Sequence, residues 1–594
     1  VGSEMCIRDS ALRGGGNVTF TGGTLQYSSS NTLDFTARIV NSTGAIGLDT
    51  NGQNVTFAGN LLSSNVGGLT KMGAGVLTLS GSNGFTGVTT LSGGTLNLGS
   101  VNALAGGGSL TFTGGTLQYT SANTSDLASR IVNSTGAIGV DTNGQSVTYA
   151  GSLVSSNTGG LAKLGSGMLT LTGSNGFTGV TTIGAGTLNL GSANALAGGG
   201  SLTFVGGTLQ LGVSGATYLN SIVSSTSVIQ VDTNANSGTL SGDIASSNTV
   251  GLNKLGSGVL TLSGSNGFTG VTTIGAGTLN LGSVNGLAGG GNVTFAGGTL
   301  QLGVSGATYL NSIVSSTSAV QVDTNANNGT LSGNITSSNT VGLNKLGSGV
   351  LTLSGSNGYT GVTTLNGGTL NLGSANALAG GGNVTFVGGT LQYSASNTSD
   401  LASRIVNSTS AIAIDTNSQN VAYSGNVAAS NSGGLLKLGT GMLTLSGSNG
   451  FTGVTTLNGG TLNLGSANAL AGGGNVTFVG GTLQYSASNT SDLASRIVNS
   501  TSAIAIDTNS QNVTYAGDVV ASNNGGLLKL GVGILTLSGS NGFTGVTTLN
   551  GGTLNLGSVN ALAGGGNVTF VGGTLQYSGS NTSDLASRIV NSTS

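Results

Sequence analysis

The chain has 594 residues, among them 114 glycines but no proline, tryptophan or histidine, and its net charge is −2. Only 5% of the residues are charged, and no basic run occurs, which excludes nucleic-acid binding through a positively charged surface. No stretch of about 18 apolar residues is present, so we expect no membrane-spanning helix. With no histidine and a single cysteine, the chain provides no imidazole base and no repeated thiol nucleophile, and we expect no enzyme activity, catalytic residue, cofactor or metal site.

The first ten residues, VGSEMCIRDS, resemble nothing that follows them and contain the only cysteine and the only glutamate of the chain. They are typical of a translated sequencing adapter. We interpret residues 1–10 as a non-native leader and residues 11–594 as β-solenoid repeats. Ala11–Phe20 (ALRGGGNVTF) matches Ala561–Phe570 (ALAGGGNVTF), and the sequence stops inside a unit at Arg588–Ser594, so we expect repeats truncated at both ends.

The segment Gly75–Ser100, GVLTLSGSNGFTGVTTLSGGTLNLGS, contains short runs in which apolar and polar residues alternate. In the first run Leu77 and Leu79 point to one side, and in the last run Leu96 and Leu98 do the same. A period of two predicts half-buried β-strands. The Ser-Asn-Gly and Ser-Gly-Gly steps between the runs predict turns.

This segment occurs six times at a spacing of 91 or 92 residues, marked by Asn83, Asn175, Asn266, Asn357, Asn449 and Asn541. Each unit holds roughly eight or nine strands, which corresponds to about three to five coils of a solenoid. We predict one elongated all-β column of about 20–30 coils, in which each turn covers the open end of the last. Stacked coils place like residues above like, so we also expect asparagine and threonine ladders along the axis.

One part of the unit differs between copies. Most units contain a polar excursion such as SANTSDLASR (residues 121–130), in which we expect one helical turn capped by Ser or Thr. Two consecutive units contain GVSGATYLNSIVSS instead, at Gly212–Ser225 and Gly303–Ser316. Both versions lie between strands, so we expect the difference to fall on a corner of the solenoid, where variation is tolerated.

Charged residues recur at fixed places. The lysines are Lys71, Lys163, Lys254, Lys345, Lys437 and Lys529, and the matching aspartates are Asp49, Asp141, Asp232, Asp323, Asp415 and Asp507. We interpret both sets as corner residues that aid solubility rather than as a comb of ligand sites. The spacing of Asp126 and Arg130 predicts a local salt bridge. Asp49–Gly52 (DTNG) begins like a calcium loop but lacks the later acidic ligands, which favours a plain Asx turn.

Each Ser-Asn-Gly step is followed by an aromatic residue, Phe85 in the first copy. If these rings were exposed, they could stack on sugars. We favour the other interpretation, in which each ring fills a corner of the core.

The run Gly67–Gly99, GGLTKMGAGVLTLSGSNGFTGVTTLSGGTLNLG, resembles the autotransporter-associated β-strand repeat, also called the passenger-associated transport repeat. The resemblance recurs in all six copies and covers about a third of each unit. We assign structural roles in this motif to Lys71, Gly75, Leu77, Leu79, Asn83, Phe85, Gly94, Leu96 and Leu98.

The resemblance implies a right-handed parallel β-helix that forms the passenger of a bacterial type V secreted protein, located at the cell surface, in the outer membrane or outside the cell. It implies an outer-membrane translocator barrel in the full-length protein and a host or bacterial surface ligand. Such passengers cross the outer membrane unfolded, and repeats without cysteine form no disulfide that could trap them. The open ends of the solenoid would allow self-association.

We therefore predict a structural or adhesive surface stalk that presents loops for contact with surfaces or cells. The alternative is a carbohydrate-binding or polysaccharide-cleaving β-helix, which would need a groove with clustered acids and exposed aromatic residues. Ice binding would need threonines in every coil on one face, whereas here threonine is mixed with Asn, Gln and Gly.

Overall fold

A computed structural model describes residues 15–593, which form an all-β parallel β-solenoid of about 26 turns with six repeats of about 91 residues. This confirms the predicted fold class, and the number of turns falls within the predicted range. The predicted leader, residues 1–10, lies outside the described residues. Within residues 15–593 the helical elements are single turns of 3-10 helix, such as η3 (Ala128–Arg130), and none of them could cross a membrane.

The chain divides into two compact units, one ending at Leu300 and one beginning at Gln301. The strands of the first compact unit are β1 (Thr24–Gln26), β2 (Ile46–Asp49), β3 (Val55–Phe57), β4 (Leu69–Met72), β5 (Val76–Leu79), β6 (Thr89–Leu91), β7 (Thr95–Leu98), β8 (Leu110–Phe112), β9 (Thr116–Gln118), β10 (Ile138–Asp141), β11 (Ser146–Tyr149), β12 (Leu161–Leu164), β13 (Met168–Leu171), β14 (Thr181–Ile183), β15 (Thr187–Leu190), β16 (Leu202–Phe204), β17 (Thr208–Leu211), β18 (Ala216–Tyr218), β19 (Ile229–Asp232), β20 (Gly238–Leu240), β21 (Leu252–Leu255), β22 (Val259–Leu262), β23 (Thr272–Ile274), β24 (Thr278–Leu281) and β25 (Val293–Phe295). Strand β26 (Thr299–Leu302) spans the boundary, and the strands of the second compact unit run from β27 (Ala307–Tyr309), the counterpart of β18, to β51 (Thr574–Tyr577).

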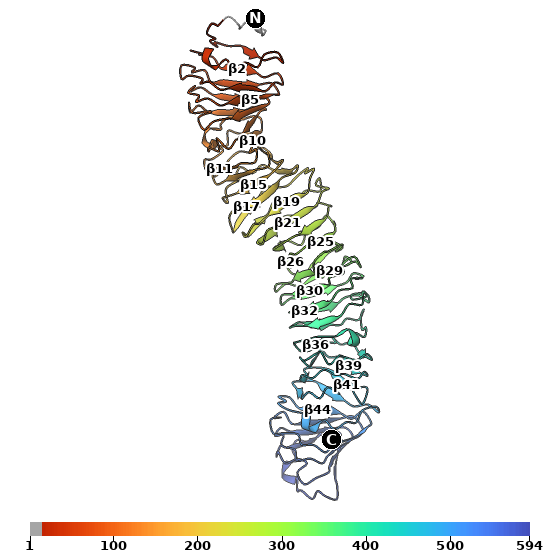
Figure 1. The fold of residues 1–594 in the computed structure, drawn as a ribbon. Helices are drawn as coiled ribbons and strands as arrows, with labels where there is room; N and C mark the ends of the chain where they lie inside the picture. Colours follow the sequence, from red (N-terminus) through yellow and green to blue (C-terminus); the bar gives the residue numbers. More distant parts are fainter. Residues whose placement is uncertain (1–14, 594) are drawn as a thin grey trace. The chain divides into compact units, whose positions relative to one another are not determined.

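Within each compact unit the strands stack in parallel, turn upon turn (Figure 1). Paired residues lie 19 to 23 positions apart in the sequence, as Val76 opposite Thr95 and Ile138 opposite Leu161 show. Burial alternates along the strands, so that Leu77 and Leu79 of β5 face the core while Thr78 faces outward. The period-two prediction is therefore confirmed, and leucine, isoleucine and phenylalanine side chains fill the centre of every turn.

Equivalent strands of successive repeats belong to different sheets. The motif strand is β4 in one repeat, β12 in the next and β21 in the one after, and these three lie in three separate sheets. Strand β12 continues the column of strands that contains β5, not the column that contains β4. One repeat thus contains a little more than four turns, and within this compact unit each repeat is shifted by one face of the solenoid relative to the repeat before it.

The part that differs between copies was predicted at a corner; it lies between β9 and β10 in the first version and between β17 and β19 in the second. In the first version η3 forms one helical turn, and the Asp126 carboxylate accepts the Ala128 N–H at 2.9 Å. The predicted Ser or Thr cap was wrong, because the side chain that accepts the Ala128 N–H is the carboxylate of Asp126. In the second version strand β18 takes the place of the helical turn and pairs with β20.

Candidate functional site

The repeated lysine lies inside the solenoid. Lys71 of β4 is 0% exposed, and its Nζ donates to Thr50 Oγ1 at 2.9 Å and to the carbonyl oxygens of Met72 at 2.7 Å, Gly73 at 2.8 Å and Gly93 at 3.0 Å. We call this group of oxygens the lysine cage. The prediction of a solubilising corner residue was wrong for the lysines.

The reason for this burial is local. Lys71 follows the buried Leu69 by two positions in an alternating strand, so the period of two turns both side chains inward. The other lysines are equally buried and donate to equivalent carbonyls; they are Lys163, Lys254, Lys345, Lys437 and Lys529.

Burial lowers the pKa of Lys71 to about 8, and the nearby Asp49 carboxylate opposes this shift. The ammonium group is therefore largely protonated at neutral pH, and its N–H donors are used by the cage. We interpret the six lysines as structural anchors that join neighbouring turns.

Two glycines of the motif allow the turns to approach each other closely. Gly94 has φ +59°, a conformation that L side chains rarely adopt, and a Cβ there would collide with the carbonyls of Gly73 and Gly75. A Cβ on Gly75 would likewise collide with the carbonyl of Gln53.

Asn83 joins three successive turns from a buried position. Its Oδ1 accepts the Leu61 N–H at 2.9 Å, and its Nδ2 donates to the carbonyls of Gly81 at 3.2 Å and Ala103 at 3.0 Å. Phe85, in the same corner, is 3% exposed, which confirms that the ring fills the core and contradicts sugar stacking by this aromatic set. The motif leucines Leu77, Leu79, Leu96 and Leu98 are also buried.

Sequence reasoning missed a second set of buried asparagines. Asn65 accepts the Ser42 N–H at 3.0 Å and donates to the carbonyls of Ile39 and Leu62. It also missed buried tyrosine pairs, such as Tyr119 and Tyr149, whose hydroxyl groups lie 3.0 Å apart. The recurrence of these residues at the repeat spacing was the signal that could have found them.

The outward-facing residues form short polar ladders along the axis. Threonines stack on threonines, as Thr70, Thr90 and Thr111 do, which is the predicted arrangement. The predicted asparagine ladder is instead made of unlike residues. Asn97 donates to Gln118 at 2.6 Å, and Gln118 donates to the Asp141 carboxylate at 2.7 Å. The other oxygen of Asp141 accepts the Asn143 N–H at 2.8 Å. This last bond is the predicted Asx turn, which Asp49 and Asn51 form in the same way.

Asp126 and Arg130 do not form the predicted salt bridge; within residues 15–593 they bond to different turns. Arg130 donates from Nε to the carbonyl of Gly108 at 2.8 Å and from Nη1 to that of Leu104 at 2.9 Å, both one turn earlier. Asp126 accepts N–H groups of Ala150 and Gly151 one turn later, both at 2.8 Å. We call residues 120–131 the charged corner.

The second version of the corner, Gly212–Ser225, contains no charged residue, and we call it the neutral corner. Asn220 takes over the role of Arg130, because its Nδ2 donates to the equivalent carbonyls of Leu196 at 3.4 Å and Gly200 at 2.6 Å. Beside Asn220 lies a hollow of about 190 Å³, which is lined by residues of this corner and of the preceding turn.

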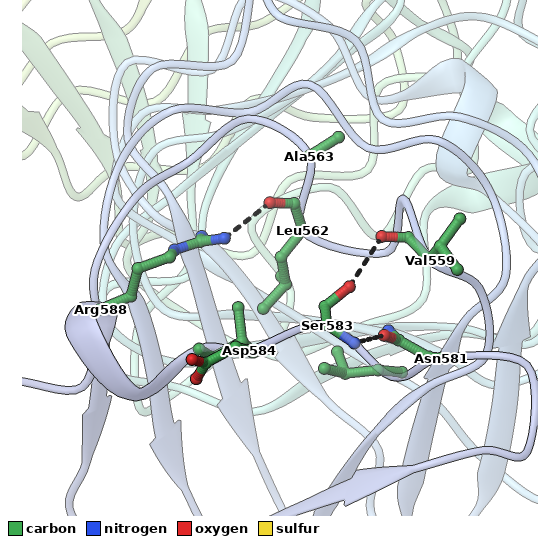
Figure 2. A pocket seen from close by; sticks show the side chains of 9 residues that line it. Val559, Leu562, Ala563, Asn581, Ser583, Asp584 and Arg588 are labelled. Atoms are coloured by element: carbon green, nitrogen blue, oxygen red, sulfur yellow. Dashed lines mark hydrogen bonds between the residues drawn. The ribbon is translucent and has the colours of Figure 1, made fainter.

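A larger hollow of about 240 Å³ lies among the last described turns (Figure 2). There Arg588 donates to the carbonyl of Leu562 at 2.9 Å, and Asp584 caps the following helical turn. In the charged corner of an earlier repeat, the carboxylate that matches Asp584 accepts two N–H groups from the next turn. The residues around this hollow thus match residues that bond neighbouring turns together in the earlier charged corner.

The described residues contain no group of three or more His, Cys, Asp or Glu side chains that could hold a metal ion. What the repeats do offer is a constant interior, and corners that differ in charge.

The passenger-associated-transport-repeat family matches six segments, residues 69–98, 161–190, 252–281, 343–372, 435–464 and 527–556. The chain is also 33% identical over 600 residues to the adhesin BmaC autotransporter of Brucella suis biovar 1 (strain 1330). That alignment covers 86% of this chain and 17% of the relative, so the chain spans about a sixth of the relative's length. No solved structure gives a significant match.

These six matches coincide with the strands that carry the lysine cages. Together with the autotransporter relative, they indicate a location at the cell surface or outside the cell. The chain is an autotransporter passenger repeat protein.

Proposed function

We propose that this chain is an adhesive segment of an autotransporter passenger, which touches surfaces or cells through the corners of its turns. The observation that carries the proposal is the contrast between a constant interior and a corner that exists in a charged and a neutral version. The similarity to a protein named as an adhesin supports the same function. A translocator domain in the full-length protein belongs to this proposal.

The role we propose is non-enzymatic. The carboxylates of Asp126 and Asp141 accept backbone and side-chain hydrogen bonds that hold turns together. A polysaccharide-cleaving enzyme would need two carboxyl groups about 5–10 Å apart on either side of a bound sugar chain. The bonds these carboxylates make are those of a scaffold, which supports adhesion over cleavage.

The test is surface display of the chain on a bacterium that does not adhere. The chain would be fused to a translocator domain, and a solenoid passenger of similar length without these repeats would be the control. We expect attachment to host cells or clumping above the control, with equal amounts of both passengers at the surface. Attachment no greater than the control would contradict an adhesive function.

A further inference from the structure

The neutral corner combines a rigid floor with an open rim. Its hollow, about 190 Å³ in volume, is lined by Asn194 and Leu196 of the preceding turn and by Thr217, Tyr218, Leu219 and Asn220. No charged residue contributes to the lining. A charged ligand would lose its hydration here without gaining an oppositely charged partner, so we expect a ligand for this hollow to be neutral.

The floor is held in place before any ligand arrives. Asn220 is 4% exposed and its amide is bonded to the carbonyls of Leu196 and Gly200. The buried Tyr218 donates its hydroxyl to the carbonyl of Ser192 at 3.3 Å. A floor of this kind loses little conformational entropy when a ligand binds.

The rim carries groups that the fold does not use. Leu219 is 78% exposed, although its neighbours Tyr218 and Asn220 are both buried. The side chains of Thr217 and Asn194 are exposed and form no hydrogen bond within residues 15–593. The rim thus offers one aliphatic surface, one hydroxyl group and one amide, the last two able to donate and to accept.

We propose that the neutral corner binds one neutral sugar ring of a glycan. The hydroxyl and amide match sugar hydroxyls, which also donate and accept, and Leu219 matches the C–H face of the ring. The hollow is smaller than the roughly 300–1,000 Å³ of sites for drug-sized ligands, which suits a single ring. This inference rests on the proposed adhesive function and names the class of ligand.

The same sequence recurs at Gly303–Ser316, where Leu310 is 74% exposed and Thr308 is the counterpart of Thr217. The charged corner presents Asp126 and Arg130 at the corresponding place instead. We therefore expect sugar binding at the neutral corners only, and no binding at the charged ones.

The test uses the full chain and saturation-transfer NMR with the methyl glycosides of glucose, galactose and N-acetylglucosamine, with N-acetylneuraminic acid as a charged probe. We expect transfer to at least one neutral glycoside and none to the charged sugar. The paired substitutions Leu219→Ala with Leu310→Ala should weaken binding about tenfold, and Thr217→Val with Thr308→Val about threefold to tenfold. All four side chains are exposed, so folding should be unaffected.

The matched control is Val88→Ala with Val362→Ala, which removes exposed apolar side chains from another corner and should leave binding unchanged. The sugar site is overturned if no neutral glycoside binds, if the charged sugar binds equally well, or if the corner substitutions have no effect. It is also overturned if a peptide, and no sugar, occupies the corner. Displayed cells that still adhere with both leucines substituted would overturn the sugar site and leave the adhesive function standing, whereas no adhesion by the unaltered chain would contradict that function.

Discussion

The interior and the corner of a repeat use different side chains as hydrogen-bond donors to buried backbone carbonyl groups. In both places backbone carbonyl groups lose contact with water and need a donor. In the lysine cage the donor is a lysine in all six copies, as Lys71 shows. At the corner the donor is Arg130 in one version and Asn220 in the other, and both bond to equivalent carbonyls.

The difference follows from how each place is enclosed. The lysine cage is surrounded by turns on both sides, so only a long cation attached to an inward strand position reaches it. At a corner the backbone can take another route. Strand β18 brings a short amide to the place that an arginine reaches from η3. The geometry thus fixes the donor of the lysine cage, whereas the donor at a corner can change when the backbone of that corner changes with it.

The largest effect should follow from Lys71→Met, which keeps the length of the side chain and removes its donors. The buried carbonyls of Gly73 and Gly93 would lose their donor, whereas that of Met72 would keep the Thr50 N–H, and we expect a loss of about 2–4 kcal/mol in the stability of the turns around β4. Hydrogen exchange of amides 69–98 measures this, because a solenoid turn depends mainly on its neighbours. Val88→Ala is the control and should change stability by less than about 0.5 kcal/mol. Unchanged exchange in Lys71→Met would show that the cage is not an anchor.

A smaller loss is expected from Asn220→Ala. The substitution leaves the carbonyl of Gly200 without its donor and that of Leu196 with the Gly199 N–H alone, which should cost about 1–3 kcal/mol. Urea unfolding of the full chain, followed by exchange at β18 and β20, gives the measurement. A stability equal to that of the unaltered chain would mean that water replaces the amide.

Arg130→Ala should cost less, about 1 kcal/mol, because the half-buried guanidinium leaves carbonyls that water can reach. Arg130→Lys is the informative companion, since a single ammonium cannot span both carbonyls and should recover only part of the loss. A larger loss of stability for Arg130→Ala than for Asn220→Ala would contradict the assignment of equivalent roles to these two side chains.

The smallest effect per residue concerns protonation of the lysine cages. Burial lowers the pKa of Lys71 to about 8 from 10.5, so between these values the folded chain binds fewer protons than the unfolded chain. The free energy of unfolding should therefore rise as the pH increases from 8 to 10. The surrounding carbonyls favour the charged form, so we expect less than about 1 kcal/mol per lysine.

Urea titrations at several pH values measure this rise, and Lys71→Met should reduce its slope. Tyrosines act in the opposite direction above pH 10, because burial raises the pKa of Tyr218 to about 12 and the folded chain then holds protons that the unfolded chain loses. A flat or falling profile between pH 8 and 10 would contradict the assigned environment of the lysines.

The fold could be predicted from the sequence because its signals are periodic. Alternation at Leu77 and Leu79 predicts strands, and the spacing of 91 or 92 residues predicts a solenoid. The burial of Lys71 was also available from its position two residues after Leu69, but the expectation that charged residues face water outweighed it. In this strand the geometry of alternation decides which way a side chain points.

The partners of the corner residues could not be predicted in the same way. Arg130 bonds to a carbonyl 26 residues earlier, and finding that partner requires the length of each turn. Turn lengths vary from 19 to 23 residues between pairs such as β5 with β7 and β10 with β12. The ionic pairing of Asp126 with Arg130 was therefore the natural local prediction, and the stacked turns override it.

The shift of one face per repeat bears on how such an array can evolve. Near-identical repeats recombine easily, and the loss or gain of one whole copy preserves the junctions between strands. Every later corner of the same compact unit would nevertheless move to the next side of its column. Changes in copy number would thus redirect the outward surface without altering a single side chain.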